Sequence, residues 1–240
     1  MSVTRAGTAG VPHSALADTL LDRLTATYSA AADPARAAPM RAYMKDVAPF
    51  LGLTTPVRRA LSRTVVEGTP RPDENDCTAV ALRCWRLPER EYHYFAVDYL
   101  RRHVSRCSSR FLPVARQLVT TVSWWDTVDL IAAHVAGPLV AADPALKAEM
   151  DAWIVDDDLW VARAALLHQL RYKDHTDTER LFSYCLRQSG HPDFFIRKAI
   201  GWCLREYAKT DPDAVRGFLA RERGRFAPLS VREALKNIGP

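Results

Sequence analysis

Apolar residues recur along the chain with the spacing of helix faces, and the sequence shows no sustained two-residue alternation of the kind that marks half-buried strands. In residues 14–31, for example, four leucines fall on one side of a helix: Leu16, Leu20, Leu21 and Leu24. Similar patterns predict helices over residues 56–67, 74–86, 89–104, 110–121, 124–141, 144–155, 158–172, 177–188, 193–208, 212–224 and 229–238. The sequence therefore predicts an all-α protein.

Several of these helices have clear start signals. A capping side chain precedes a proline at Thr55-Pro56, Asp143-Pro144 and Asp211-Pro212. The cap accepts hydrogen bonds from the first free backbone amides, and proline fits the first helical position because its missing N–H would have no partner there. These dipeptides support the helix boundaries that the apolar spacing predicts.

The second half of the chain also repeats itself weakly. Trp160 with Arg163, Phe194 with Arg197 and Leu229 with Arg232 recur at steps of 34 or 35 residues, and Asp129 lies 34 residues before Arg163. A period of this size, holding two helices, is typical of solenoids built from stacked antiparallel helical pairs. Equivalent helices of such a solenoid line one concave wall. We therefore expect a right-handed solenoid in which Asp129, Arg163, Arg197 and Arg232 face a common basic groove.

A chain of 240 residues fits a single domain, which we assign to residues 13–240, after a mobile tail over residues 1–12 that contains Gly7, Gly10 and Pro12. The formal net charge is +5, and arginine strongly outnumbers lysine. Arginine makes forked contacts to phosphate, so the charge favours nucleic acid as the partner. Periodicity and charge alone nevertheless favour a protein-binding scaffold, because most helical-repeat proteins are binders.

The five cysteines form no Cys-x-x-Cys pair, and the seven histidines show no metal-ligand spacing. We therefore expect reduced thiols, no metal site and no cofactor, with Cys77 and Cys84 in the core. No apolar stretch approaches the length of a membrane span, and no leader pattern opens the chain. These features predict a soluble, cytoplasmic protein, and a monomer is the default.

Candidate chemistry is concentrated in aromatic segments. Trp125 and Asp129 are four residues apart and share a helix face. Arg197, Lys198 and Trp202 form a second group. An earlier segment, residues 41–45, places the aromatic Tyr43 close to the cation Lys45. Each feature also has an ordinary structural explanation, since a tryptophan usually packs in a core and an arginine on a helix is usually solvated.

Together these segments resemble the AlkD family of DNA alkylation-repair glycosylases, which are built from HEAT-like helical repeats. The resemblance rests on residues 42–45, 50–53 with Pro56, Arg58 and Arg59, 123–129, 159–160 with Arg163, 170–173, 195–202 and 204–207. These segments follow one another in the family's order from about residue 40 onward. Their joint occurrence is specific, although each alone is weak.

The resemblance implies roles for individual residues. Asp129 would be the catalytic carboxylate, and Trp125 and Trp202 would flank the deoxyribose of the lesion. Arg163 would contact the DNA backbone beside the lesion, and Tyr43 would lie at the groove. Lys45, Arg197, Lys198 and Arg232 complete the expected DNA-binding set. One departure is Ala162, where the family often has a second basic residue, so one phosphate contact is in doubt.

The implied reaction is hydrolysis of the N-glycosidic bond of N3- or N7-alkylated purines in duplex DNA. Such bases carry a positive charge and leave without protonation, and the family acts without flipping the base, which would also admit bulky adducts. General repair and self-resistance to a DNA-alkylating metabolite both remain open. A non-catalytic DNA-binding relative and a protein-binding scaffold remain as alternatives.

Overall fold

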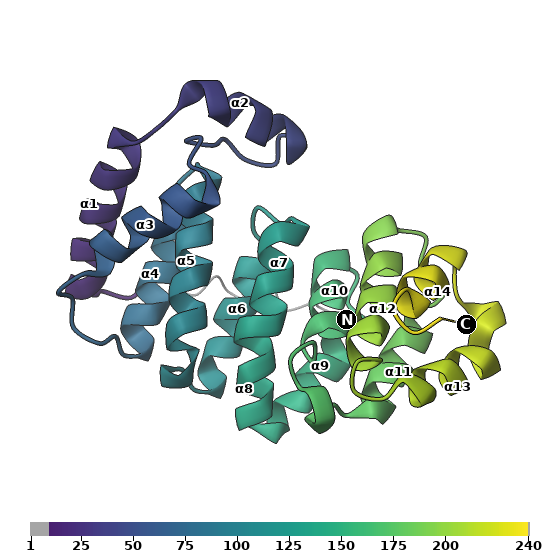
Figure 1. The fold of residues 1–240 in the computed structure, drawn as a ribbon. Helices are drawn as coiled ribbons and strands as arrows, with labels where there is room; N and C mark the ends of the chain where they lie inside the picture. The colour runs from purple at the N-terminus through teal and green to yellow at the C-terminus, as the bar shows by residue number, and fades with distance from the viewer. Residues whose placement is uncertain (1–9, 240) are drawn as a thin grey trace, which may run out of the picture. The chain divides into compact units, whose positions relative to one another are not determined.

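The computed structural model describes residues 10–239, and all regular structure within them is helical (Figure 1). The predicted all-α class is thus confirmed. The chain divides into two compact units, Met1–Ser123 and Trp124–Pro240. Of the predicted tail over residues 1–12, only residues 10–12 are described, and they precede the first helix; the remainder lies outside the described residues. None of the described helices is long and apolar enough to span a bilayer.

The described part of the first unit, residues 10–123, contains six α-helices. Their bounds are α1 (Ala15–Ala30), α2 (Pro34–Tyr43), α3 (Thr55–Val66), α4 (Glu74–Arg86), α5 (Arg90–His103) and α6 (Leu112–Val119), with 3-10 turns at Val104–Arg106 and Ser109–Phe111 between the last two. Helix α1 packs against α3 and α4, and α4 packs against α5. At the start of α4, Asp73 and Asp76 form a reciprocal capping box, which satisfies two free amides at once.

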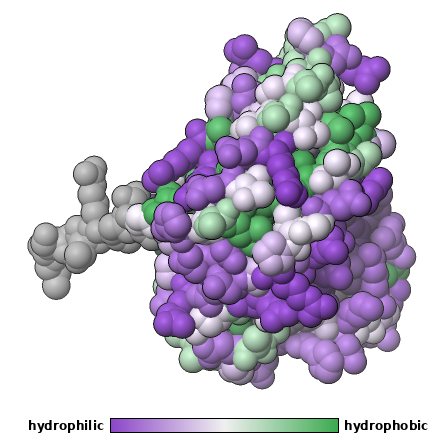
Figure 2. Space-filling model, turned by 90° about the vertical axis from the view of Figure 1, so that its left-hand side faces the viewer, coloured by the Kyte–Doolittle hydropathy of each residue, from purple (hydrophilic) through white to green (hydrophobic). Residues whose placement is uncertain are grey.

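The core of this unit is aromatic and aliphatic. Tyr28 of α1 stacks on Tyr92 of α5, with ring centroids 5.7 Å apart, and meets Phe95 edge-on at 6.4 Å. Cys77 and Cys84 of α4 are fully buried, which confirms their predicted place in the core. Seen from the side nearest α1, the surface is mainly hydrophilic, and hydrophobic residues appear in smaller groups between the polar ones (Figure 2).

Helix α2 was not predicted. It buries none of its residues, so it lacks the apolar stripe on which the other helices were recognised, and it carries Pro39 in its interior. Its start does carry the capping signal seen elsewhere: Asp33 precedes Pro34 and accepts the backbone N–H groups of Ala35 and Arg36. The helix therefore depends on its cap and its flanking loops rather than on a buried face.

The second unit repeats pairs of helices. Its helices are α7 (Trp125–Ile131), α8 (Gly137–Ala142), α9 (Lys147–Trp153), α10 (Leu159–Leu167), α11 (Thr178–Arg187), α12 (Phe194–Tyr207), α13 (Pro212–Glu222) and α14 (Pro228–Leu235). Helix α7 packs against α10, α10 against α12, and α12 against α14, while α9, α11 and α13 pack beside this row (Figure 1). This row carries the repeat found in the sequence, as a stack of HEAT-like helical pairs requires.

The helix predicted over residues 124–141 is present, as a continuous helical run over residues 125–142. Within it a π-helical turn, Ala132–Ala136, joins α7 to α8. Pro138 lies two residues after this turn, and proline lacks the N–H that a regular helix would use there. Gly137 allows the close approach of the next segment, because a Cβ at this position would lie 2.3 Å from the backbone oxygen of His168. Its own carbonyl accepts a hydrogen bond from Tyr172 Oη at 2.7 Å.

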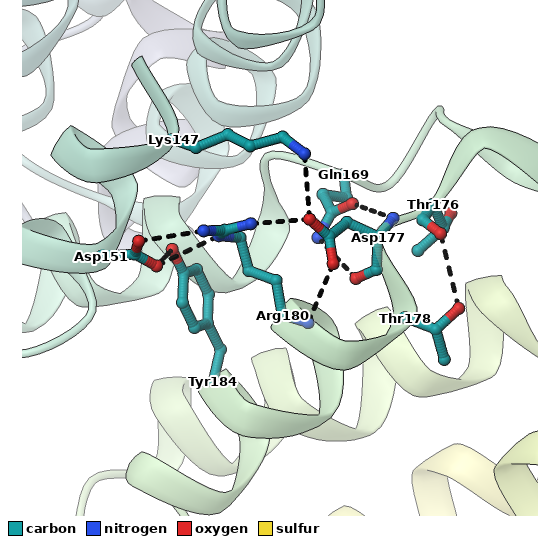
Figure 3. A network of polar contacts seen from close by, with 8 residues as sticks. All are labelled: Lys147, Asp151, Gln169, Thr176, Asp177, Thr178, Arg180 and Tyr184. Carbon is teal, nitrogen blue, oxygen red and sulfur yellow. Dashed lines mark hydrogen bonds and ion pairs between the residues drawn. The ribbon is translucent and has the colours of Figure 1, made fainter. Parts of the chain in front are cut away.

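Polar side chains join α9 to α11 (Figure 3). Arg180 donates to both carboxylate oxygens of Asp151, at 3.1 and 2.9 Å, and to Asp177 at 2.6 Å. Lys147 also bonds Asp177, and Tyr184 Oη donates to Asp151 at 2.7 Å. The Arg180 contact lowers the pKa of Asp151. These contacts hold the outer helices of adjacent pairs together without covering the inner row.

Candidate active site

Asp129 and Arg163 form a forked ion pair between α7 and α10. Arg163 Nε lies 2.7 Å from Asp129 Oδ1, and Nη2 lies 2.8 Å from Oδ2. Both side chains are buried, with 7% of Asp129 and 4% of Arg163 exposed. The two residues occupy equivalent positions in successive repeats, so the periodicity in the sequence corresponds to direct contact in the fold. Two-point geometry of this kind fixes the plane of the carboxylate.

Two opposing influences act on this carboxylate. Burial raises the pKa of Asp129, because a low-dielectric environment disfavours the charged form, while the hydrogen bonds and charge of Arg163 lower it. Burial is the larger influence, so the pKa of Asp129 is raised overall. Two N–H groups of Arg163 nevertheless point at the two carboxylate oxygens, and this forked geometry is that of an ion pair that holds the buried carboxylate in a fixed position.

An aromatic cluster supports the pair from one side. Trp124, Trp160 and Phe195 contact one another with ring centroids 5.0 to 5.6 Å apart. Arg163 also donates through Nη1 to the backbone carbonyl of Phe195, and its guanidinium carbon lies 5.9 Å from the Phe195 ring centroid. Each ring sits at or just before the start of α7, α10 or α12. The aromatic rings thus pack beside the guanidinium, whose hydrogen bonds go to the Asp129 carboxylate and the Phe195 carbonyl.

Sequence reasoning did not assign a role to Phe195. Its contribution is a backbone carbonyl, which carries no signature in the amino-acid pattern. The only signal was its place two residues before Arg197 in the repeated segment. Trp124 and Trp160 likewise support the site rather than face it, and the N–H of the Trp124 indole is buried without a hydrogen-bond partner among the described residues.

Trp125 and Trp202 are both partly exposed, on α7 and α12 respectively. Trp125 begins α7 one turn before Asp129. Trp202 follows Gly201, where a Cβ would lie 2.5 Å from Glu233 Cβ on α14, so glycine is required for this close helix contact. The two indoles and the ion pair therefore come from three helices that pack in series: α7, α10 and α12.

The remaining basic residues of this unit differ in their surroundings. Arg197 donates through Nε to the carbonyl of His191 at 2.9 Å. Lys198 pairs with Glu233 at 2.6 Å, so much of its charge is neutralised within the protein. Arg232 is exposed and has no ion pair within the described residues. No group of three or more histidines, cysteines or acids in the described part of the chain could hold a metal ion.

Comparison with known proteins decides the family. The family model described as DNA alkylation repair enzyme matches residues 24–238. The chain belongs to this family. A solved structure described as a predicted DNA alkylation repair enzyme from Enterococcus faecalis is similar over 86% of this chain and 96% of that one, with 31% sequence identity and a TM-score of 0.79. No curated protein matches.

This finding confirms the family resemblance seen in the sequence. All nine of the predicted site residues, from Tyr43 to Arg232, lie inside the matched range. The Asp129–Arg163 pair and both indoles belong to the second unit. Tyr43 and Lys45 belong to the first.

Tyr43 and Lys45 lie at the end of α2. Tyr43 is the last residue of that helix and is 73% exposed, more than any other large hydrophobic side chain in the described part of the chain. Lys45 has a left-handed backbone (φ 57°), as does Asp46 (φ 58°), and these two residues turn the chain away from the helix. An exposed ring and an exposed cation at a tight turn are free to contact a ligand.

Proposed function

We propose that this DNA alkylation repair enzyme is a glycosylase. It hydrolyses the N-glycosidic bond of positively charged N3- or N7-alkylated purines in duplex DNA. The observation that carries the proposal is the buried carboxylate of Asp129, which the forked contact with Arg163 holds in place one helical turn after partly exposed Trp125. An acid that is buried, ionised and oriented is suited to stabilise a developing positive charge.

The reaction needs no acid catalyst. Alkylation places a positive charge on the purine, so the electron pair of the breaking bond neutralises the base as it leaves. The sugar then carries positive charge at C1′, water supplies the oxygen of the new bond, and its proton passes to solvent. Asp129 stabilises the sugar cation and orients the water, since each carboxylate oxygen keeps a lone pair beside its bond to Arg163. Unmodified purines, being poor leaving groups, remain intact.

Trp125 and Trp202 act on the sugar through their ring faces. The negative face of an indole attracts a cationic or electron-poor group, with the strongest effect where water is excluded. Neither indole is sequestered in a closed cavity, and both are partly exposed. A site of this kind contacts sugar and phosphate while the base stays stacked, so the proposed substrates include bulky adducts as well as methylated purines.

Side chains from each unit bind the DNA backbone. In the proposal, Arg232, Arg197 and Lys198 bind phosphates from the second unit, and Tyr43 and Lys45 contact the backbone from the first. Arg163 holds Asp129 with Nε and Nη2, and a second hydrogen on each terminal nitrogen is left for a phosphate oxygen beside the lesion.

The test compares the wild type with Asp129→Asn. Methylated duplex DNA is incubated with excess enzyme, and free 3-methyladenine and 7-methylguanine are measured over time. We expect the substitution to reduce the rate of release by about 100-fold or more, because the loss of one preorganised electrostatic group has effects of this size. Glu149→Gln, which removes an exposed carboxylate from α9 of the same unit, should release both bases at the wild-type rate.

DNA binding by each variant is measured in parallel by gel shift. Retained binding with lost release assigns the chemistry to Asp129. A wild type that binds duplex DNA but releases neither methylpurines nor a bulky cationic adduct would instead be a non-catalytic DNA-binding protein. A wild type that does not bind duplex DNA at low salt would be a scaffold for another partner.

A further inference from the structure

A basic segment spans the end of helix α5 and the 3-10 turns that follow it in the first unit, outside the proposed active site. No acidic residue occurs between Asp98 and Asp126, and this stretch holds five arginines and one histidine: Arg101, Arg102, His103, Arg106, Arg110 and Arg116. The first four arginines are exposed, and none has an ion pair with a described residue. We call Arg101, Arg102, Arg106 and Arg110 the basic segment.

The acids that approach this segment are already engaged. Asp98 pairs with Arg58 of α3 at 2.8 Å. Glu74 of α4 accepts the backbone N–H of Ser108 at 2.6 Å and so anchors the turn without neutralising a guanidinium. Arg83, near the end of α4 and half-buried, by contrast pairs with Asp18 of α1. The positive charge of the basic segment is therefore left for an external partner.

Local helix electrostatics do not account for the whole cluster. Cations at the C-terminus of a helix are stabilised by its dipole, and this explains Arg101 and Arg102 in the last turn of α5. The effect falls off within one turn. Arg106 and Arg110 lie in the 3-10 turns beyond the helix.

His103 lies among these arginines, and their positive charges influence its pKa. His103 packs against Tyr99, with ring centroids 4.7 Å apart and ring planes tilted by 53°, and its pKa is lowered by burial and then by the charges of Arg102 and Arg106. Three serines, Ser105, Ser108 and Ser109, lie among the arginines and offer hydroxyl donors. Guanidinium forks interleaved with hydroxyl groups form a donor set suited to phosphate oxygens.

From this geometry we propose that the basic segment is a second DNA-binding surface, on the first unit, that contacts phosphates of duplex DNA. This second surface rests on the proposed function in one respect, namely that the phosphate-bearing partner is DNA. It differs from the predicted set, which comprises Tyr43 and Lys45 at the end of α2 and residues of the second unit. A repeated array of phosphates at constant spacing fits four exposed guanidinium groups better than a compact anion does.

The experiment measures binding of the full-length protein to an undamaged DNA duplex across a range of salt concentrations. The test variant is Arg106→Gln with Arg110→Gln. The control variant is Arg71→Gln with Arg86→Gln, which removes the same charge from two other exposed arginines of the first unit. For the test variant we expect the slope of log affinity against log salt to become shallower by about two, because each lost phosphate contact reduces it by about 0.9.

The control should change the slope by less than half as much. A test variant that changes the slope no more than the control overturns the proposal, since net charge alone would then explain the effect. Binding of duplex RNA that is lost while DNA binding is retained also overturns it, in favour of an RNA surface. A wild type that does not bind duplex DNA at low salt would contradict the proposed glycosylase function as well. A test variant that fails while the wild type binds DNA would contradict only the second DNA-binding surface.

A second readout excludes indirect effects on the active site. Base release by the test variant, measured with DNA and enzyme at saturating concentrations, should match the wild-type rate. A variant that binds normally but releases bases slowly would place these arginines in the chemistry and overturn the proposal.

Discussion

At the scale of single residues, Glu91 shows how a buried charge positions a distant surface. Its carboxylate, 1% exposed, accepts the backbone N–H groups of Leu51, Gly52 and Leu53 at 2.9 to 3.0 Å. Gly52 has a φ of 88°, and a Cβ there would lie 2.1 Å from the carbonyl oxygen of Asp33. The same loop accepts the N–H of Asp33 at 2.7 Å, through the carbonyl of Leu51. Glu91 thus fixes the start of α2, the helix that ends at Tyr43.

Replacing this acid with its amide should be costly. In Glu91→Gln one acceptor oxygen becomes an NH₂ group that faces backbone donors, so at least one buried amide loses its partner. We expect the free energy of unfolding to fall by about 2 kcal/mol, measured by urea denaturation. Glu89→Gln, at the N-cap of α5 without a side-chain capping bond, should change it by less than about 0.5 kcal/mol. Equal effects of the two substitutions would show that Glu91 does not hold the loop.

The candidate site shows which residue roles a sequence can carry. The 34-residue step from Asp129 to Arg163 was visible in the pattern, and the structure joins the two side chains directly. The step could not show that Arg163 is buried and paired, because periodicity gives a position in the repeat but not a partner. The roles of Trp125 and Trp202 in binding the sugar stay predictions, as do those of the DNA-binding residues.

At the scale of helices, the apolar pattern predicted most elements because most of them bury one face. Residues 74–86 coincide with α4, whose buried positions recur at helical spacing. Helix α2 was missed because it has no buried face. The helix predicted over residues 124–141 is present as a continuous helical run over residues 125–142, but the pattern did not show its π-helical turn, which precedes Pro138 because proline cannot donate to the regular helical ladder. The prediction for residues 158–172 ran past the end of α10 at Leu167, where His168 forms the C-cap.

The C-cap residue His168 makes the stability of the protein depend on pH. His168 is buried, its Nδ1 lies 2.6 Å from the carbonyl of Ala165, and burial lowers its pKa to about 4. In the unfolded chain the pKa of a histidine side chain is about 6.5. Between these two values the unfolded state binds the additional proton, so stability decreases as the pH falls from about 6.5 towards 4.

We expect this group to remove about 2 kcal/mol from the free energy of unfolding between pH 7 and pH 5. In His168→Asn an amide keeps the hydrogen bond to Ala165 but cannot titrate, so the same change of pH should cost the variant correspondingly less. Urea denaturation at both pH values measures the difference. His175→Asn, which replaces an exposed histidine, should retain the full wild-type loss. If His168→Asn loses as much stability as the wild type, the acid sensitivity has another origin.

At the scale of the whole molecule, two units of packed helices carry an excess of arginine on their surfaces, and the net charge is +5. Phosphate contacts give affinity without reading base sequence, whereas the proposed selection depends on the positive charge of the lesion. We therefore expect affinity for DNA to depend on phosphate contacts and salt, and selection of the base to depend on the lesion alone. Four phosphate contacts would give a decrease in affinity of roughly 100-fold between 50 and 200 mM salt, because the logarithmic slope is about 0.9 per contact.

This separation can be measured with two duplexes of unrelated sequence, each prepared with and without a single 7-methylguanine. We expect all four to bind within about three-fold of one another at a given salt concentration, and we expect base release from the two methylated duplexes only. The reason is that each base-specific contact would add roughly 1–3 kcal/mol of discrimination, which a surface of guanidinium groups facing phosphates does not supply. Binding that is insensitive to salt, or that favours one sequence by more than about ten-fold, would show that base edges rather than phosphates carry the affinity.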